Sequence, residues 1–119
     1  MYELEDIEFV KGDENKKVFR FSASGDKWIM LEIKKGQSAG NHYHKGLVKV
    51  KTPEVGIVIK GKLEYELTDV KTGKKETVVV EAPKIIKIPP FVQHKLTALE
   101  DSMFIEPTSD DVMKDRFEM

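Results

Sequence analysis

Two short stretches contain every histidine of the chain: Gly36-Gln37-Ser38-Ala39-Gly40-Asn41-His42-Tyr43-His44 and Pro89-Pro90-Phe91-Val92-Gln93-His94. In an extended strand, residues two apart point to the same side, so His42 and His44 can present both imidazoles to one point. Histidine is also the commonest metal ligand in proteins. The pattern predicts that the three histidines act together at one metal ion. Three unrelated surface or loop histidines are the alternative.

Around these stretches the hydrophobic pattern has a period of two. Lys62-Leu63-Glu64-Tyr65-Glu66-Leu67 alternates between charged and apolar residues, as in a strand with one buried face. Short apolar runs of the same kind recur along the chain and are separated by turn signals such as Thr72-Gly73-Lys74-Lys75. This spacing predicts an all-β sandwich or barrel. Residues 34–44 are expected to be a polar loop that holds His42 and His44.

The tail after Pro107 is the one helical candidate. Ser109 is a suitable N-cap, and Lys114 and Arg116 suit a last helical turn. We therefore expect a short C-terminal helix after the strands.

Composition narrows the class of protein. With 119 residues the chain has room for one domain, 1–119, and its 20 basic and 21 acidic residues give a net charge of −1. Such a balance does not favour nucleic-acid binding, which needs a concentrated basic face. The absence of cysteine excludes disulfides and thiolate zinc sites. No apolar run is long enough for a membrane span, and the first residues do not resemble a signal peptide, so a cytoplasmic location is expected.

A set of spaced residues carries a resemblance to a known family. In order along the chain, the set is Gly36, His42, His44, Glu54 and Gly61. These residues resemble the first motif of the cupin superfamily, which runs Gly, five residues, His-x-His, three or four residues, Glu, six residues and Gly. Pro89 and His94 match the second cupin motif. The resemblance covers about residues 28–106. It implies a double-stranded β-helix, the jelly-roll barrel.

The residues of the two motifs, His42-Tyr43-His44-Lys45 and Lys84-Ile85-Ile86-Lys87-Ile88-Pro89-Pro90, resemble those of small cupins that act on nucleotide-linked sugars. The C-terminal cupin half of capsular-polysaccharide epimerase/reductase enzymes is one example. The resemblance implies a small-molecule ligand, a sugar nucleotide among the candidates. It also implies a homodimer, in which the segment Tyr2 to Val10 could add a strand to a neighbouring copy.

Three imidazoles and one carboxylate form a mixed nitrogen and oxygen set that suits Zn, Mn, Fe, Ni or Cu as a divalent ion. We expect His42, His44, Glu54 and His94 to be the ligands, with positions left open for water or substrate. Nine residues, 45–53, separate His44 from Glu54, where the cupin motif has three or four. The sequence therefore leaves two alternatives: Glu54 is a metal ligand, or it is a surface carboxylate.

Further residues are candidates for contacts with a ligand. Gly56 lies two residues after Glu54, where a glycine in a strand often marks close approach of a ligand or of backbone and would leave room for a substrate beside the metal; a β-bulge is the alternative. Tyr65 should face the interior and is the candidate catalytic side chain, although a packed core tyrosine is the alternative. Lys45, Lys49 and Lys51 lie in the 45–53 insertion and could attract a phosphate or carboxylate, or could simply be solvated.

Three functions remain open from the sequence. The first is an epimerase or isomerase of a nucleotide-linked keto-sugar. The second is a metal-dependent dioxygenase or isomerase of another small molecule. The third is a non-catalytic metal-binding or ligand-binding module. If the metal takes all three histidines, any general base must be a carboxylate, a lysine, a tyrosine or metal-bound hydroxide.

Overall fold

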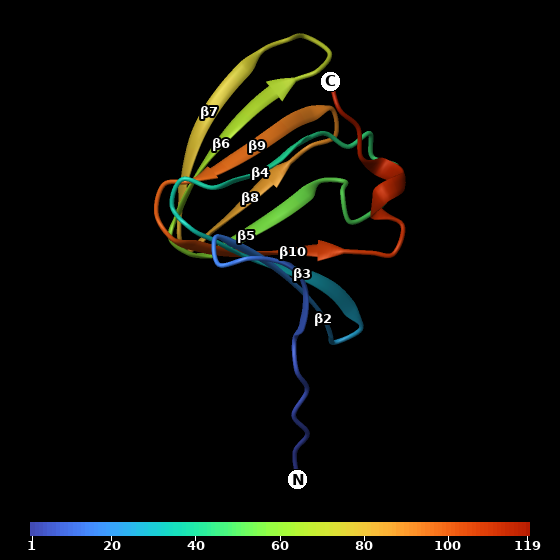
Figure 1. Ribbon diagram of the computed structural model, residues 1–119. Coiled ribbons are helices and arrows are strands. Elements are labelled where there is room, and N and C mark those ends of the chain that lie inside the picture. The colour runs from blue at the N-terminus through green and yellow to red at the C-terminus, as the bar shows by residue number, and fades with distance from the viewer.

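The computed structural model describes residues 1–119 and contains two antiparallel sheets that face each other (Figure 1). The first sheet has six strands, in the order β1 (Glu8–Gly12), β2 (Lys16–Ala23), β3 (Asp26–Ile33), β10 (Ser102–Thr108), β5 (Glu54–Lys60) and β8 (Lys84–Ile88). The second has four, in the order β4 (Ser38–His42), β9 (Val92–Ala98), β6 (Lys62–Asp69) and β7 (Lys75–Glu81). The predicted all-β, jelly-roll architecture is confirmed.

The core lies between the two sheets and follows the period-two pattern. In β6, Leu63 and Tyr65 are buried while Glu66 is exposed, as the alternation predicts. The buried apolar cluster consists of Leu31, Ile33, Val58, Leu63, Tyr65, Val80, Ile88, Leu96, Ala98 and Phe104. Both sheets contribute to it, so burial of this one cluster holds them together.

Strand pairing places the site residues at one end of this core. In the four-stranded sheet, His42 at the end of β4 lies directly opposite His94 in β9. Glu54 is the first residue of β5 in the facing sheet, where it pairs with Ile88 at the end of β8. Pro89 and Pro90 follow and end that strand, as their sequence predicts.

The N-terminal half contains two strands that the sequence pattern did not indicate. Residues 38–42 form β4, although we expected residues 34–44 to be a loop, because Ala39 pairs with Leu96 and packs against the core. Residues 8–12 form β1 and pair with β2 of the same chain, so only part of the segment 2–10 is unpaired. Residues 1–7 extend away from the body (Figure 1).

The C-terminal segment is less helical than expected. Its only helix is a four-residue 3-10 helix, η1 (Val112–Asp115), and β10 continues through Pro107 to Thr108. Ser109 does not cap this helix; its hydroxyl donates to Asp111 Oδ1 at 2.5 Å. Contacts with the rest of the molecule, described below, fix this segment, and so short a helix has little stability of its own. No helix of this structure has the length and apolarity needed to cross a bilayer.

Candidate metal centre

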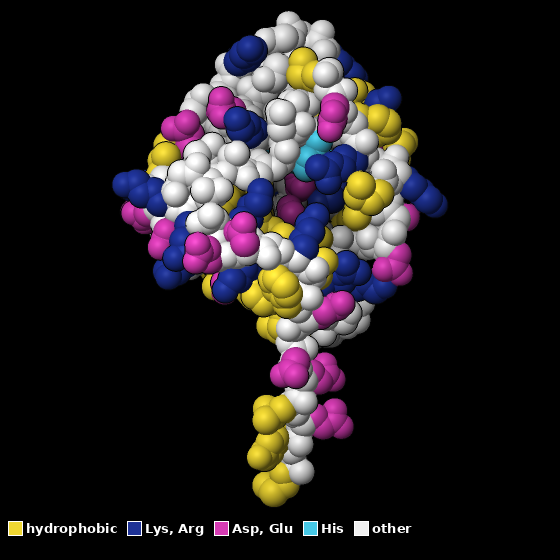
Figure 2. Space-filling model, viewed as in Figure 1, with side chains coloured by type: hydrophobic (Ala, Val, Ile, Leu, Met, Phe, Trp, Pro, Cys, Tyr) yellow, Lys and Arg dark blue, Asp and Glu magenta, His cyan; other side chains and the backbone are white.

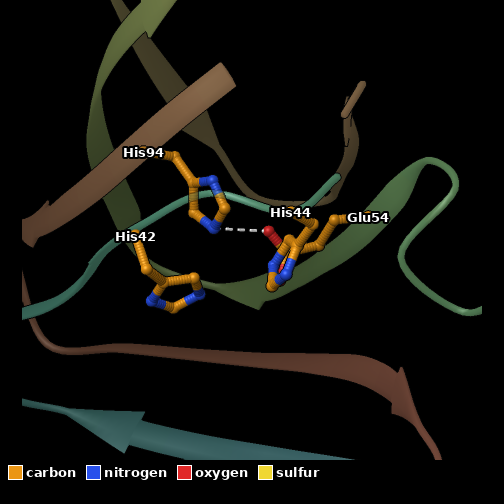
Figure 3. A group of neighbouring side chains, drawn as sticks. All are labelled: His42, His44, Glu54 and His94. Atoms are coloured by element: carbon orange, nitrogen blue, oxygen red, sulfur yellow. Dashed lines mark ion pairs between the residues drawn. The ribbon is translucent and has the colours of Figure 1, made fainter. Parts of the chain in front are cut away.

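Four side chains from different elements converge at one end of the barrel (Figure 3). They are His42 from β4, His44 from the loop after it, Glu54 from β5 and His94 from β9. Each offers one ligand atom, and these atoms all lie within 4.8 Å of one another. The structure therefore brings together all four residues that the motif spacing singled out, Glu54 included.

A bulge at the end of β4 directs His42 inward. The pairing register of β4 with β9 shifts between Gly40 and His42, and Gly40 and Asn41 have φ angles of +89° and +81°. A side chain at Gly40 would place its Cβ 3.0 Å from the backbone oxygen of His94, so a glycine is needed for this close approach. Bulges of this kind commonly re-aim a side chain near functional sites.

Backbone carbonyls orient two of the imidazoles. Nδ1 of His44 donates to the carbonyl oxygen of Asp115, and Nδ1 of His94 donates to that of Val92 at 3.1 Å. A carbonyl can only accept, so in the neutral rings the lone pair lies on Nε2, which faces Glu54. Such outer hydrogen bonds are typical of metal-ligating histidines.

The inner atoms of the cluster lack ordinary hydrogen-bond partners. Nδ1 of His42 and Nε2 of His44 are buried and form no hydrogen bond. Oε2 of Glu54 lies 2.6 Å from Nε2 of His94, without a well-aligned hydrogen bond. Buried nitrogen and oxygen atoms without partners are costly in a protein interior. A cation held between them would satisfy all of them, so the donor set fits a divalent transition metal.

The electrostatic environment keeps His42 and Glu54 in the forms that can bind metal. Burial, with the nearby charges of His94 and Arg116, lowers the pKa of His42 to about 3, so this ring is neutral at pH 7. Burial alone would raise the pKa of Glu54, but the close His44 and His94 imidazoles and the charge of Lys51 outweigh burial and leave the pKa lowered. Metal binding to His42 and Glu54 therefore needs no prior loss of a proton.

The pKa of His94 shifts in the other direction. Burial lowers it, but the close contact with the Glu54 carboxylate and its charge outweigh burial and leave the pKa raised. Protonation of His94 is thus favoured by the Glu54 carboxylate that it faces at 2.6 Å. A metal ion at the same point would take the place of that proton.

The insertion 45–53 is held in place by the C-terminal segment. The Asp115 carboxylate, fully buried, accepts hydrogen bonds from the backbone N–H groups of Lys45, Leu47 and Val48 at 2.6, 2.7 and 3.3 Å. Phe117 pairs with Tyr43 through two backbone hydrogen bonds. The insertion is therefore a fixed loop, and Glu54 after it reaches the histidines.

Within this loop, Lys51 is buried, whereas a solvated lysine was one of the two alternatives expected from the sequence. Its side chain is buried, and Nζ donates to Oε1 of Glu54 at 3.0 Å. Burial lowers the Lys51 pKa, but the charges of Glu106 and Glu54 outweigh burial and leave it raised, so Lys51 is a cation. Lys45 instead lies over the Phe117 ring, 4.1 Å from its centre, and Lys49 is exposed.

Glu106 is a site residue that the sequence reasoning missed. It lies in β10 on the same face as buried Phe104, two residues earlier, and lines the cavity together with His42, Glu54 and His94. Burial and the charge of Glu54 raise its pKa to about 7, against the opposing effect of Lys51. The alternation of Ser102, Phe104 and Glu106 along one strand face was the available signal.

The cluster opens into a cavity of about 900 Å³ between the sheets. Tyr65, the candidate catalytic residue, lines it, and burial together with the charges of Glu106 and Glu54 raises the pKa of its hydroxyl. A Cβ at Gly56 would lie 3.2 Å from this hydroxyl and 3.1 Å from Ile86. The side chains that approach Gly56 closely are therefore Ile86 and Tyr65 of the same barrel.

Comparison with known proteins finds likeness in structure alone. No protein-family model and no curated protein matches the sequence. Among solved structures, the capsular polysaccharide assembling protein CapF from Staphylococcus aureus matches with a TM-score of 0.72 at 19% identity, over 98% of this chain and 33% of CapF. Oxalate decarboxylase from Bacillus subtilis matches with a TM-score of 0.68 at 14% identity, over 96% of this chain and 30% of that one. The chain thus spans about a third of the length of either relative.

Proposed function

We propose that this chain, which has the cupin fold, binds one divalent transition metal ion through His42, His44, Glu54 and His94 and acts on a small molecule in the adjoining cavity. One observation carries the proposal. Carbonyls orient His44 and His94 so that their inner nitrogens meet the buried Glu54 carboxylate, where His44 Nε2 and Glu54 Oε2 have no hydrogen-bond partner. When bound there, a divalent ion would polarise an oxygen atom of the ligand as a Lewis acid.

The charge around the cavity favours an anionic ligand. Figure 2 shows histidine and acidic side chains at the bottom of a hollow, with basic side chains around its rim. The basic residues that line the cavity are Lys11, Lys16, Arg20, Lys27, Lys95 and Arg116. Of these, Lys27 is already paired with Asp110 at 2.7 Å. The others would attract phosphate or carboxylate groups to the entrance.

Within this class we propose a nucleotide-linked keto-sugar as the substrate and epimerisation or isomerisation as the reaction. A sugar nucleotide offers phosphates to the basic rim and a carbonyl oxygen to the metal site. The structural likeness to a protein described as assembling capsular polysaccharide supports a carbohydrate substrate. The resemblance of the sequences around His42 and Pro89 to cupins that act on nucleotide-linked sugars also supports a carbohydrate substrate.

Glu106 is the group best suited to move a proton in this reaction. A general base works best when its pKa lies near the working pH, and that of Glu106 is raised to about 7. Burial, the largest cause of this shift, does not depend on what Glu54 binds. We propose that the Glu106 carboxylate removes a proton from the carbon next to the keto group. The Tyr65 hydroxyl, protonated at neutral pH because its pKa is raised, would orient the substrate.

Hydrogen exchange into the substrate tests this function. Metal-loaded protein would be incubated with a nucleotide-linked 4-keto-sugar in D₂O, and incorporation of deuterium measured by mass spectrometry. The Glu106→Gln variant should exchange more slowly by about 100-fold or more, the usual loss for a general base. The variant Glu66→Gln, which alters an exposed carboxylate of β6, is the matched control and should exchange at the wild-type rate.

Other outcomes would contradict the epimerase proposal and identify its rivals. Oxygen uptake by the Fe(II)-loaded protein, without deuterium exchange, would support a dioxygenase. Saturable binding of a sugar nucleotide without exchange or turnover would support a non-catalytic binding module. Equal exchange by wild type and by Glu106→Gln would leave the metal site in place and remove Glu106 as the base.

A further inference from the structure

The two oxygens of the Glu54 carboxylate have different surroundings. Oε1 accepts a hydrogen bond from Nζ of Lys51 at 3.0 Å and lies 3.4 Å from Nε2 of His44. Oε2 lies 2.6 Å from Nε2 of His94 and has no hydrogen-bond partner (Figure 3). One oxygen is therefore held by a cation of the protein itself, and the other is free to accept a second cation.

The ammonium group of Lys51 has one defined place. Its side chain is only 8% exposed, and the one hydrogen-bond acceptor of Nζ is Glu54. The turn that carries it is fixed by the carbonyl oxygen of Val48, which accepts from the backbone N–H of Lys51 at 3.2 Å and from Oγ1 of Thr52 at 2.8 Å. Lys51 also forms a β-bridge with Glu54. Lys51 therefore cannot turn away to solvent while this loop keeps its structure.

A fixed ammonium group limits how the neighbouring carboxylate can bind a metal. Carboxylates bind metal ions through one oxygen or through both. A divalent ion bound to Oε1 of Glu54 would lie close to Nζ of Lys51, and two like charges in a poorly solvated interior repel each other strongly. The partnerless Oε2 is free of this repulsion. The ion is therefore directed to one oxygen of the pair.

We propose that Lys51 is a positioning residue that makes Glu54 bind the divalent ion through Oε2 alone, which keeps two positions on the ion for a ligand. The proposal rests on the metal-dependent function proposed above. Three imidazole nitrogens and one carboxylate oxygen are four protein donors, so an ion that prefers six donors retains two positions. If both oxygens of Glu54 were bound, only one would remain.

Two adjacent positions suit a ligand with two neighbouring oxygen atoms. A keto-sugar has such a pair: its carbonyl oxygen and a hydroxyl oxygen on the next carbon. Lys51 belongs to the insertion 45–53, so the extra length of this loop supplies the group that controls Glu54. Lys51 itself does not line the cavity, and it acts on the ligand only through Glu54.

The number of water molecules bound to manganese tests the proposal. Protein loaded with Mn²⁺ alone would be checked for one ion per chain by mass spectrometry, and metal-bound water would be counted from the relaxation of water protons. We expect about two bound waters in wild type and about one in Lys51→Met, where Glu54 can use both oxygens. Lys49→Met, at an exposed lysine of the same loop, is the matched control and should keep the wild-type number.

Two small anions separate the loss of a position from general damage to the site. Acetohydroxamate offers two adjacent oxygens, whereas azide binds through one nitrogen. Removal of the Lys51 charge weakens binding of both anions, so the ratio of their affinities is the readout. In Lys51→Met this ratio should fall by about tenfold or more against acetohydroxamate, because that anion loses its second contact. In Lys49→Met the ratio should not change.

The outcomes distinguish this role of Lys51 from the function on which it rests. One bound water in the metal-loaded wild type would overturn the role of Lys51, and this measurement does not depend on whether any variant folds. Equal water numbers, or an unchanged affinity ratio, in wild type and Lys51→Met at full metal loading would overturn it as well. In each of these cases the metal-dependent function would stand. Absence of bound metal in the wild type would overturn both.

Discussion

Nδ1 of His44 donates a hydrogen bond to the backbone carbonyl of Asp115, which lies 71 positions later in the chain. The same aspartate accepts three backbone hydrogen bonds from the loop that follows His44. One C-terminal residue therefore orients a proposed metal ligand and fixes the loop between that ligand and Glu54. The proposed metal site and the C-terminal segment are therefore one structural unit.

Replacement of Asp115 by alanine should weaken both the fold and the site. The change leaves three backbone donors without their charged acceptor, which should lower the free energy of unfolding by about 2–4 kcal/mol. Looser positioning of His44 should reduce zinc affinity by about tenfold or more. Urea unfolding and zinc titration measure the two effects. Asp110→Ala, which removes an exposed aspartate from the same segment, should change neither; comparable losses in both variants would contradict this role of Asp115.

Lys51 should matter most when no metal is bound. It is the buried cation that contacts Glu54, and Lys51→Met would leave that carboxylate with less compensation, at a cost of about 3 kcal/mol or more. A divalent ion would replace the missing charge, so saturating zinc should stabilise Lys51→Met more than wild type. Thermal unfolding with and without zinc measures this difference. Lys49→Met, at an exposed lysine of the same loop, should behave like wild type.

Gly56 and the Tyr65 hydroxyl should be energetically coupled. An added Cβ at Gly56 would lie 3.2 Å from that hydroxyl, closer than most such contacts, so the tyrosine would have to shift. Gly56→Ala should therefore be less destabilising in a Tyr65→Phe background, by about 0.5–1 kcal/mol. A double-mutant cycle by urea unfolding measures the coupling. Additive effects would show that Ile86 alone limits the space.

Glu106 should give the metal-free protein a distinct pH dependence. Its pKa rises from an ordinary value of 4.5 to about 7 in the folded state, so between these values the folded state binds more protons than the unfolded one. Stability from this group is therefore lost as pH rises through that window. Glu106→Gln lacks this group, so wild type should lose stability relative to the variant between about pH 4.5 and 7. Parallel unfolding curves across that range would contradict the raised pKa.

The fold was largely predictable because its strands have one buried face. Alternation in Leu63 and Tyr65, and the stop at Pro89, are local signals that the structure confirms. β4 was missed because its sequence, Ser38 to His42, is polar and contains a glycine, and it becomes a strand only by pairing with β9. The short helix was overestimated for the same reason: tertiary contacts of Asp115 and Phe117 decide that segment.

The convergence of the four proposed ligands was also accessible from spacing, whereas their surroundings were not. His42 and His44 lie two positions apart, and Glu54 lies seven positions before Gly61 as in the motif that it resembles. The burial of Lys51 depends on how residues 45–53 fold, which no local pattern reveals. Nor does any local pattern reveal that the Asp115 carbonyl, far along the chain, accepts a hydrogen bond from His44.

The most direct test of the central claim is the metal content of the protein. Untagged chain purified without chelators would be analysed by inductively coupled plasma mass spectrometry, beside His42→Ala, His94→Ala and Glu54→Gln, with Glu66→Gln as control. We expect close to one divalent transition metal ion per chain in wild type and control, and a large loss in the three site variants. Absence of bound metal in the wild type, even after incubation with Zn, Mn, Fe, Ni and Cu ions in turn, would contradict the account.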